Sequence, residues 1–113
     1  MTGDTQFAFQ RLDIYRVSRE LMVLVVAARI RDVEFRDQAT RAVKSQFLNI
    51  SEGLPSGTLA KRRKYFEDAQ RSLFECVAAV DGGHGIEAID SARVGQIMPL
   101  SHRVDMMLRK LMK

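Results

Sequence analysis

Apolar residues along this chain of 113 residues recur every three or four positions, and no segment alternates between apolar and polar residues as a half-buried strand does. The helical period is interrupted by a polar break near residues 31–36 and by two breaks rich in Gly or Pro, at 53–57 and 82–85. The pattern therefore predicts four helices, which span about residues 12–31, 35–52, 58–80 and 90–112. Because the connections are short, we expect an all-α, up-down-up-down four-helix bundle that forms a single domain, residues 1–113.

Individual residues predict how these helices begin and end. Gly53 is a candidate for a left-handed residue that ends the second helix. Ser56 or Thr58 can cap the start of the third helix. Pro99 falls inside the fourth helix, where a proline removes a hydrogen bond and clashes with the preceding turn at a cost of about 3 kcal/mol. We expect a kink at Pro99, or a fourth helix in two pieces.

The first predicted helix is apolar on all sides for about two turns, from Leu21 to Ala28. A helix of a bundle needs only one apolar face. The surplus apolar surface is covered either by a thick core or by another subunit, and we favour the subunit interface. The sequence thus predicts a homo-oligomer.

Composition narrows the class of protein. The net charge of +4 and the pI near 9.6 are compatible with nucleic-acid binding but do not demonstrate it. The chain has a single cysteine, which excludes an internal disulfide and fits a reducing compartment. No signal peptide is visible at the N-terminus, and no apolar run approaches the ~20 residues that a membrane-spanning helix needs. We expect a cytoplasmic protein with no membrane partner.

The residue types that usually carry catalysis or bind metals do not form a recognisable site. The inward Glu-x-x-His pattern of di-iron bundles does not occur at His84 or His102, so we expect no metal and no cofactor. Cys76 lies on the predicted apolar face of the third helix and is expected to be a core residue rather than a nucleophile. Glu52 and Glu75 could pair for acid–base chemistry, but a structural role is the better interpretation. The sequence predicts a protein that is not an enzyme.

A polar stripe runs beside an apolar one along the second predicted helix. Four polar residues from Arg41 to Glu52 follow one another at spacings of four, four and three, so they share one side of the helix. Ser and Asn compete with the backbone for hydrogen bonds and are poor choices for the middle of a solvent-facing helix. We expect a structural polar network between the second and third helices or across subunits. Its predicted members are Arg41, Ser45, Asn49, Glu52, Ser72 and Glu75.

The densest run of charge is Lys61-Arg62-Arg63-Lys64, in the first two turns of the third predicted helix. The partial positive charge of a helix N-terminus disfavours each nearby cation by about 0.3–1 kcal/mol, and Glu67 and Asp68 relieve only part of the repulsion. This placement is explained if the cations bind phosphate; the alternative is a solvated charged turn. The predicted nucleic-acid-binding residues are Lys61, Arg62, Arg63 and Lys64, helped by Arg41 and Lys44.

Two blocks of the sequence resemble the four helix bundle protein family, which includes proteins encoded in intervening sequences of bacterial 23S rRNA genes. The matching residues of the first block are Gln38, Arg41, Ala42, Ser45, Asn49, Ile50, Glu52 and Gly53. Those of the second block are Phe66, Ala69, Ser72, Leu73 and Glu75. The chain departs from the family pattern at Gln46, where Ile is usual, at Ser51, where Ala is usual, and at Arg71, where Gly often stands.

The resemblance implies an assembly and partners. Characterised folds of the family form five-membered rings, so the expected homo-oligomer is a pentamer. A related branch, the accessory variability determinant of diversity-generating retroelements, consists of basic rings that engage nucleic acid and a reverse transcriptase. The expected partners are therefore further copies of this chain, RNA or DNA, and a reverse transcriptase.

Two functions remain open at this stage. The first is a non-catalytic, ring-forming accessory protein that binds nucleic acid weakly and without sequence preference through a basic surface. The alternative is a protein-binding oligomeric scaffold that has no nucleic-acid role and whose basic face is incidental.

Overall fold

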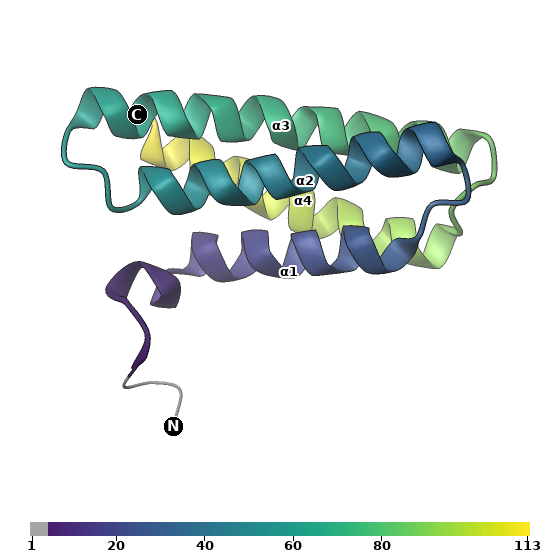
Figure 1. The fold of residues 1–113 in the computed structure, drawn as a ribbon, viewed down its shortest axis with the longest axis horizontal. Helices are drawn as coiled ribbons and strands as arrows, with labels where there is room; N and C mark the ends of the chain where they lie inside the picture. Colours follow the sequence, from purple (N-terminus) through teal and green to yellow (C-terminus); the bar gives the residue numbers. More distant parts are fainter. Residues whose placement is uncertain (1–4) are drawn as a thin grey trace.

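The computed structural model describes residues 5–113, which form a four-helix bundle preceded by a short 3₁₀ turn (Figure 1). The elements are η2 (Ala8–Arg11), α1 (Asp13–Ala28), α2 (Val33–Gly53), α3 (Leu59–Gly85) and α4 (Ser91–Leu111). Successive helices run in opposite directions, and contacts join α1 to α2, α2 to α3, α3 to α4 and α4 to α1. The predicted all-α bundle is confirmed. The predicted domain also includes residues 1–4, and the expectation of no signal peptide concerned the same stretch; these residues lie outside the described part of the chain.

The buried face of α3 has the predicted three-four spacing. Phe66, Ala69, Leu73, Cys76 and Val80 are each at most 1% exposed. Burial of a large apolar side chain stabilises the folded state by about 1.5–3 kcal/mol, so this stripe accounts for much of the attraction between α3 and its neighbours. The contacts between α2 and α3 are the most extensive in the bundle.

The connection between α1 and α2 differs from the prediction, because α1 ends at Ala28 rather than near residue 31. Arg29 adopts a left-handed conformation with φ 48°, and the turn directs Ile30 into the core. The backbone N–H of Arg31 donates to the carbonyl of Ala88 at 2.8 Å, which ties this connection to the one between α3 and α4. The chain turns within four residues, and α2 begins at residue 33, two residues earlier than predicted.

The third helix, α3, continues through Gly82 and Gly83 and ends at Gly85 rather than near residue 80. A Cβ built on Gly82 would lie 2.9 Å from the ring of Phe35, and one on Gly83 would lie 3.1 Å from Cγ2 of Ile30. These glycines therefore allow close approach of neighbouring side chains to α3. The predicted end of α3 near residue 80 is wrong because Gly82 and Gly83 serve packing rather than a turn.

Gly53 has the same kind of role at the other end of the bundle. It is the last residue of α2, and none of the described glycines has a positive φ, so the predicted left-handed cap is wrong. A Cβ on Gly53 would lie 2.7 Å from Cε1 of Phe66 and 3.0 Å from Cβ of Tyr65. The absent side chain lets the end of α2 pack directly against α3.

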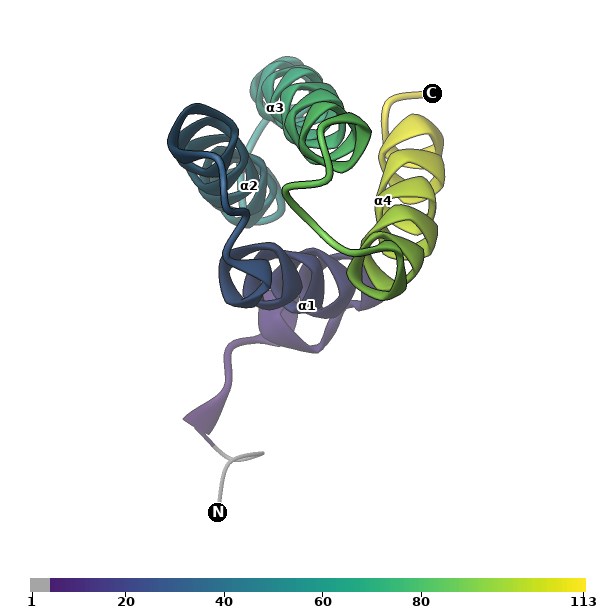
Figure 2. The same cartoon turned by 90° about the vertical axis from the view of Figure 1, so that its right-hand side faces the viewer.

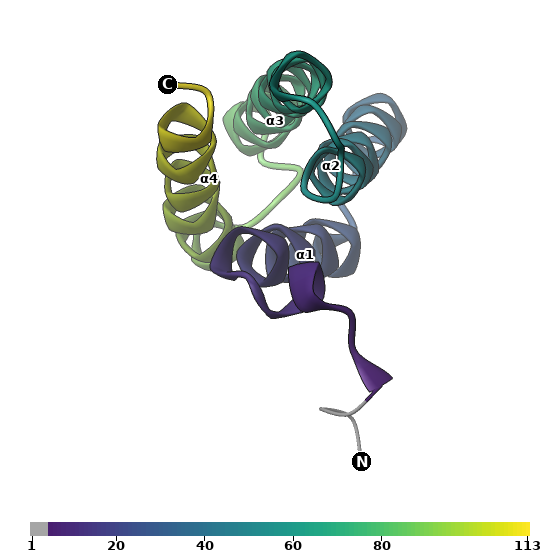
Figure 3. The same cartoon turned by 90° about the vertical axis from the view of Figure 1, so that its left-hand side faces the viewer.

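The fourth helix is continuous through Pro99, so the expectation of two separate pieces is wrong. Pro99 has no N–H, so the carbonyl of Gly95, four residues earlier, loses its helical hydrogen bond. Both residues are exposed, so water can hydrate that carbonyl. The views along the bundle show α4 crossing it obliquely (Figures 2 and 3). Its start lies beside α1, and its end approaches the start of α3. Among the described residues, no helix is both long enough and apolar enough to cross a bilayer.

Candidate nucleic-acid interface

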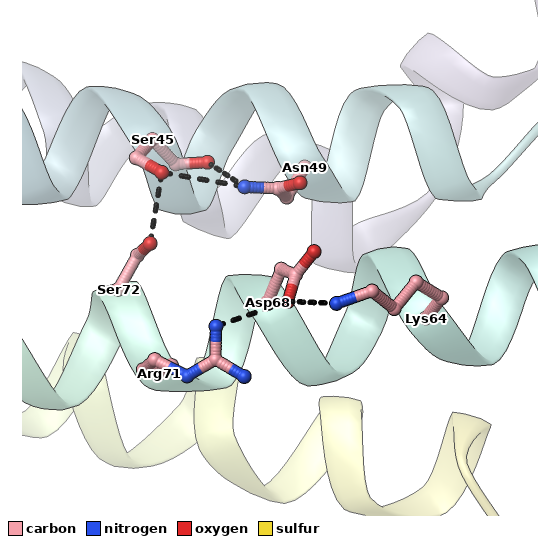
Figure 4. Close-up of polar contacts among 6 residues, drawn as sticks. All are labelled: Ser45, Asn49, Lys64, Asp68, Arg71 and Ser72. Carbon is pink, nitrogen blue, oxygen red and sulfur yellow. Dashed lines mark hydrogen bonds and ion pairs between the residues drawn. The ribbon is translucent and has the colours of Figure 1, made fainter.

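Three of the six residues predicted for the polar network meet between α2 and α3 (Figure 4). The hydroxyl oxygens of Ser45 and Ser72 lie 2.8 Å apart. Asn49 donates through Nδ2 to the backbone carbonyl of Ser45 at 3.0 Å and to its hydroxyl at 3.3 Å. Each of these side chains is buried or half-buried, so the contacts replace hydrogen bonds to water. This part of the network joins the two helices that carry the family-like blocks.

The other three predicted members, Arg41, Glu52 and Glu75, are exposed on the single chain. Within residues 5–113 their side chains form no hydrogen bond and no ion pair. The structure therefore does not bring them into the network of one subunit. Their predicted contacts across subunits remain a prediction.

The predicted cation run occupies the first two turns of α3. The helix begins at Leu59, and the hydroxyl of Thr58 accepts a hydrogen bond from the backbone N–H of Lys61 at 3.2 Å, so Thr58 is the cap. Lys61 and Arg63 are exposed, whereas Arg62 is half-buried. None of these three cations forms an ion pair with a residue of the described chain.

Lys64 differs from the rest of the run because it is paired. Its Nζ lies 3.0 Å from Oδ1 of Asp68, and Nη1 of Arg71 lies 3.1 Å from the same oxygen (Figure 4). The hydrogen bond from Lys64, with the attraction of both cations, outweighs partial burial and lowers the pKa of Asp68. Asp68 stays ionised, and the charge of Lys64 is the least available of the run.

Arg41 and Lys44 do not join the run. They line a shallow hollow with Val26 of α1, on the surface where α1 and α2 meet. An α-helix rises about 1.5 Å per residue, so Lys44 lies roughly 14 Å along α2 from Gly53, where the chain leaves for α3. The six predicted cations therefore belong to two separate surfaces.

The fold adds cations to one end of the bundle that the sequence pattern did not identify. In the half that contains residues 5–20, 46–71 and 102–113, there are twelve basic and six acidic side chains. The opposite half, residues 21–45 and 72–101, has six basic and seven acidic side chains. The excess charge is thus concentrated at the end where α3 begins and α4 finishes, which faces the viewer in Figure 3.

The residue types of catalytic and metal centres have other surroundings within residues 5–113. Cys76 is buried, and burial raises the pKa of its thiol to about 12, so the nucleophilic thiolate is not populated at neutral pH. Among these residues, no three His, Cys, Asp or Glu side chains gather where they could hold a metal ion. Nε2 of His84 lies 3.1 Å from the hydroxyl of Ser91, which joins the end of α3 to the start of α4.

A known protein family matches most of the chain. Residues 10–110 match the family described as 23S rRNA-intervening sequence protein, and the matched range contains α1, α2, α3 and all but the last residue of α4. No curated protein matches the chain.

Proposed function

The chain belongs to the 23S rRNA-intervening sequence protein family, and from this membership we propose that it is a non-catalytic accessory protein that binds nucleic acid. Binding is weak and without sequence preference, because it takes place through cations that meet the phosphate backbone. The observation that carries the proposal is the set of cations at the start of α3 without an ion-pair partner. Lys61, Arg62 and Arg63 stand against the positive end of the helix dipole, and no described carboxylate pairs with them.

Other features support a phosphate backbone as the ligand. The charge excess is confined to one end of the bundle, so a polyanion would meet several cations together. The ring contacts among the described residues link Phe7, Phe9, Tyr15 and Phe47, and none of these contacts involves α3, which carries the cation run. A cationic surface without stacking or base-edge contacts binds nucleic acid of any sequence.

The cheapest test is retention of a mixed-sequence RNA and a mixed-sequence DNA duplex at two salt concentrations. The proposal expects binding at 50 mM salt that weakens strongly at 200 mM salt, because bound cations release counterions from the nucleic acid. The absence of retention at 50 mM salt for both probes would refute it.

We also propose that the protein acts as a homo-oligomeric ring, with five copies as the family resemblance implies. Support comes from the apolar surface of α1, where Val23 is 49% exposed and Val26 is 44% exposed. Val26 adjoins Arg41, which is one of the family-like residues that has no partner within one described chain. A second copy docked on this surface would cover the apolar side chains and provide partners for the exposed polar ones.

Light scattering distinguishes the assembly from a single chain. The proposal expects a mass several times 12.8 kDa at micromolar concentration, and a pentamer has five times that mass. A mass of 12.8 kDa would refute the interface, whereas a dimer or a tetramer would refute only the ring of five.

A protein-binding scaffold is the second candidate function, and a specific surface favours it. Leu73, Phe74 and Val77 of α3 line a small, mainly apolar hollow together with Met98 of α4. Phe74 is exposed there, and exposed aromatic and Met side chains are common at protein interfaces. This candidate predicts that the protein fails to bind nucleic acid at low salt, so the RNA and DNA test separates the two functions.

A further inference from the structure

A surface hollow lies where the start of α3 meets the end of α4. It has a volume of about 350 Å³, and it is lined by cations of α3 and by cations at the end of α4 and just after it. The cationic lining residues are Arg62, Arg63, Lys110 and Lys113. The remaining lining residues, Leu59, Leu111 and Met112, are apolar, so no acidic side chain lines the hollow. A concave surface with four cations and no acidic side chain attracts an anion more strongly than a convex one does.

The cations of the hollow differ from their neighbours in having no ionic partner. Beside it, Lys64 and Arg71 pair with Asp68, and Nε of Arg109 pairs with Asp105 at 2.9 Å. None of the four lining cations pairs with a described carboxylate. The local carboxylates therefore neutralise the cations around the hollow and leave those inside it available.

The burial and hydrogen bonding of Arg62 also favour a bound anion. Its side chain is half-buried, and its Nε is buried without a hydrogen-bond partner among the described residues. An arginine held against the fold has lost part of its hydration and is oriented in advance, which lowers the entropy that binding must overcome. A guanidinium of this kind suits the oxygen atoms of a phosphate.

We propose that this hollow is where the phosphate backbone of a nucleic acid binds, with Lys110 of α4 and Lys113, two residues after α4, acting beside Arg62 and Arg63. The inference rests on the proposed nucleic-acid binding and specifies its location. It replaces one linear run of cations with a site built from two helices, and it excludes Lys64, Arg41 and Lys44 from the main contacts. The apolar lining is aliphatic, so it can contact sugars or bases of any sequence without reading them.

The test compares two variants that remove the same charge. Lys110→Gln with Lys113→Gln removes two cations of the hollow, and Arg41→Gln with Lys44→Gln removes two cations of α2 outside it. Binding of a mixed-sequence single-stranded RNA is measured by fluorescence anisotropy from 25 to 200 mM salt. A plot of log affinity against log salt has a slope of about −0.7 per phosphate neutralised on a single strand. The hollow variant is expected to lose about 1.4 from the magnitude of that slope, and the control variant much less.

Several outcomes decide between explanations. If wild-type protein binds RNA but the hollow variant keeps its slope, or the control variant loses as much, the site proposed here is wrong while the nucleic-acid function stands. If wild-type protein binds no RNA or DNA at low salt, the function itself fails and the site falls with it. If Lys110 and Lys113 only stabilise α4 through the negative end of its dipole, their variant melts at a lower temperature but keeps the slope of log affinity against log salt. That result overturns the inference.

A competition arm separates a nucleic-acid backbone from a free phosphate. Inorganic phosphate is added to the RNA complex, and sodium chloride of equal ionic strength serves as the control. For a site that binds a polymer through several weak contacts, we expect both salts to displace RNA equally. Displacement by phosphate at least tenfold more effective than by chloride would show that the hollow binds free phosphate, contrary to the proposal.

Discussion

Replacement of Gly53 by alanine tests whether the end of α2 must approach α3 closely. An alanine in the interior of a helix is favoured over glycine by about 1 kcal/mol, and the gain is smaller at the last residue of a helix. The added Cβ, however, would lie 2.7 Å from Cε1 and 3.0 Å from Cδ1 of Phe66, a side chain that is only 1% exposed. Overpacking of a core by one carbon atom typically costs about 1–3 kcal/mol.

The clash outweighs the gain in helix propensity because the Phe66 ring is enclosed and cannot turn into solvent. We expect Gly53→Ala to lower the free energy of unfolding by about 1–2 kcal/mol. The measurement is urea unfolding followed by circular dichroism at one fixed protein concentration, since assembly makes stability depend on concentration. The midpoint should fall while the dependence on urea stays unchanged.

Two further variants make the test specific. Gly95 lies inside α4, is exposed, and has nothing within 4 Å of a built Cβ, so Gly95→Ala should stabilise the protein by about 0.5–1 kcal/mol. Gly53→Asn distinguishes packing from a left-handed cap, because asparagine tolerates the left-handed conformation but is larger than alanine. Close packing predicts that asparagine destabilises more than alanine does. If Gly53→Ala is as stable as the wild type, or Gly53→Asn is more stable than Gly53→Ala, the packing explanation is refuted.

Three other substitutions have defined outcomes. Gln46 is fully buried; its Nε2 donates to a carbonyl at 3.2 Å, and its Oε1 has no hydrogen-bond partner within residues 5–113. Gln46→Met should therefore raise the free energy of unfolding by about 1 kcal/mol in urea melts, and a loss of stability would contradict this. Asn49→Ala should lower the melting temperature more than Lys61→Ala does, because only the first removes half-buried hydrogen bonds of about 1 kcal/mol each; equal melting temperatures would show that the network adds no stability. Val23→Asp with Val26→Asp should convert the oligomer to a species of 12.8 kDa in light scattering without loss of helical signal, and an unchanged mass would place the interface elsewhere.

The sequence was sufficient where a residue's role depends on its own helix. The apolar stripe of α3 follows from its spacing, and Thr58, one of two candidate caps, caps that helix. The polar network was predicted only as a set of six residues, of which Ser45 and Ser72 form a hydrogen bond. The glycines were misread because glycine serves both left-handed turns and close packing. Only the positions of Phe35 and Phe66, set by the tertiary fold, distinguish the two uses.

The candidate site, too, could be predicted only in part from the sequence. The run from Lys61 to Lys64 is visible in the sequence as adjacent charges, but its pairing with acidic residues is not. The ion pair with Asp68 makes the charge of Lys64 less available than the others. The oblique path of α4 brings Lys110 beside Arg62, although the two residues lie nearly fifty positions apart in the sequence. Charges brought together by helices that are distant in the sequence become apparent only when the helices are placed.

The measurement that bears most directly on the nucleic-acid function is the salt dependence of RNA binding by wild-type protein and by a variant in which Lys61, Arg62, Arg63 and Lys64 are all replaced by Gln. Three of these cations have no ion-pair partner among the described residues, so the slope of log affinity against log salt should shrink by about 2 on a single strand. Affinity should fall for every sequence alike, while circular dichroism shows an intact bundle. Binding with an unchanged slope, or no binding by the wild type at low salt, would contradict the proposed role of this surface.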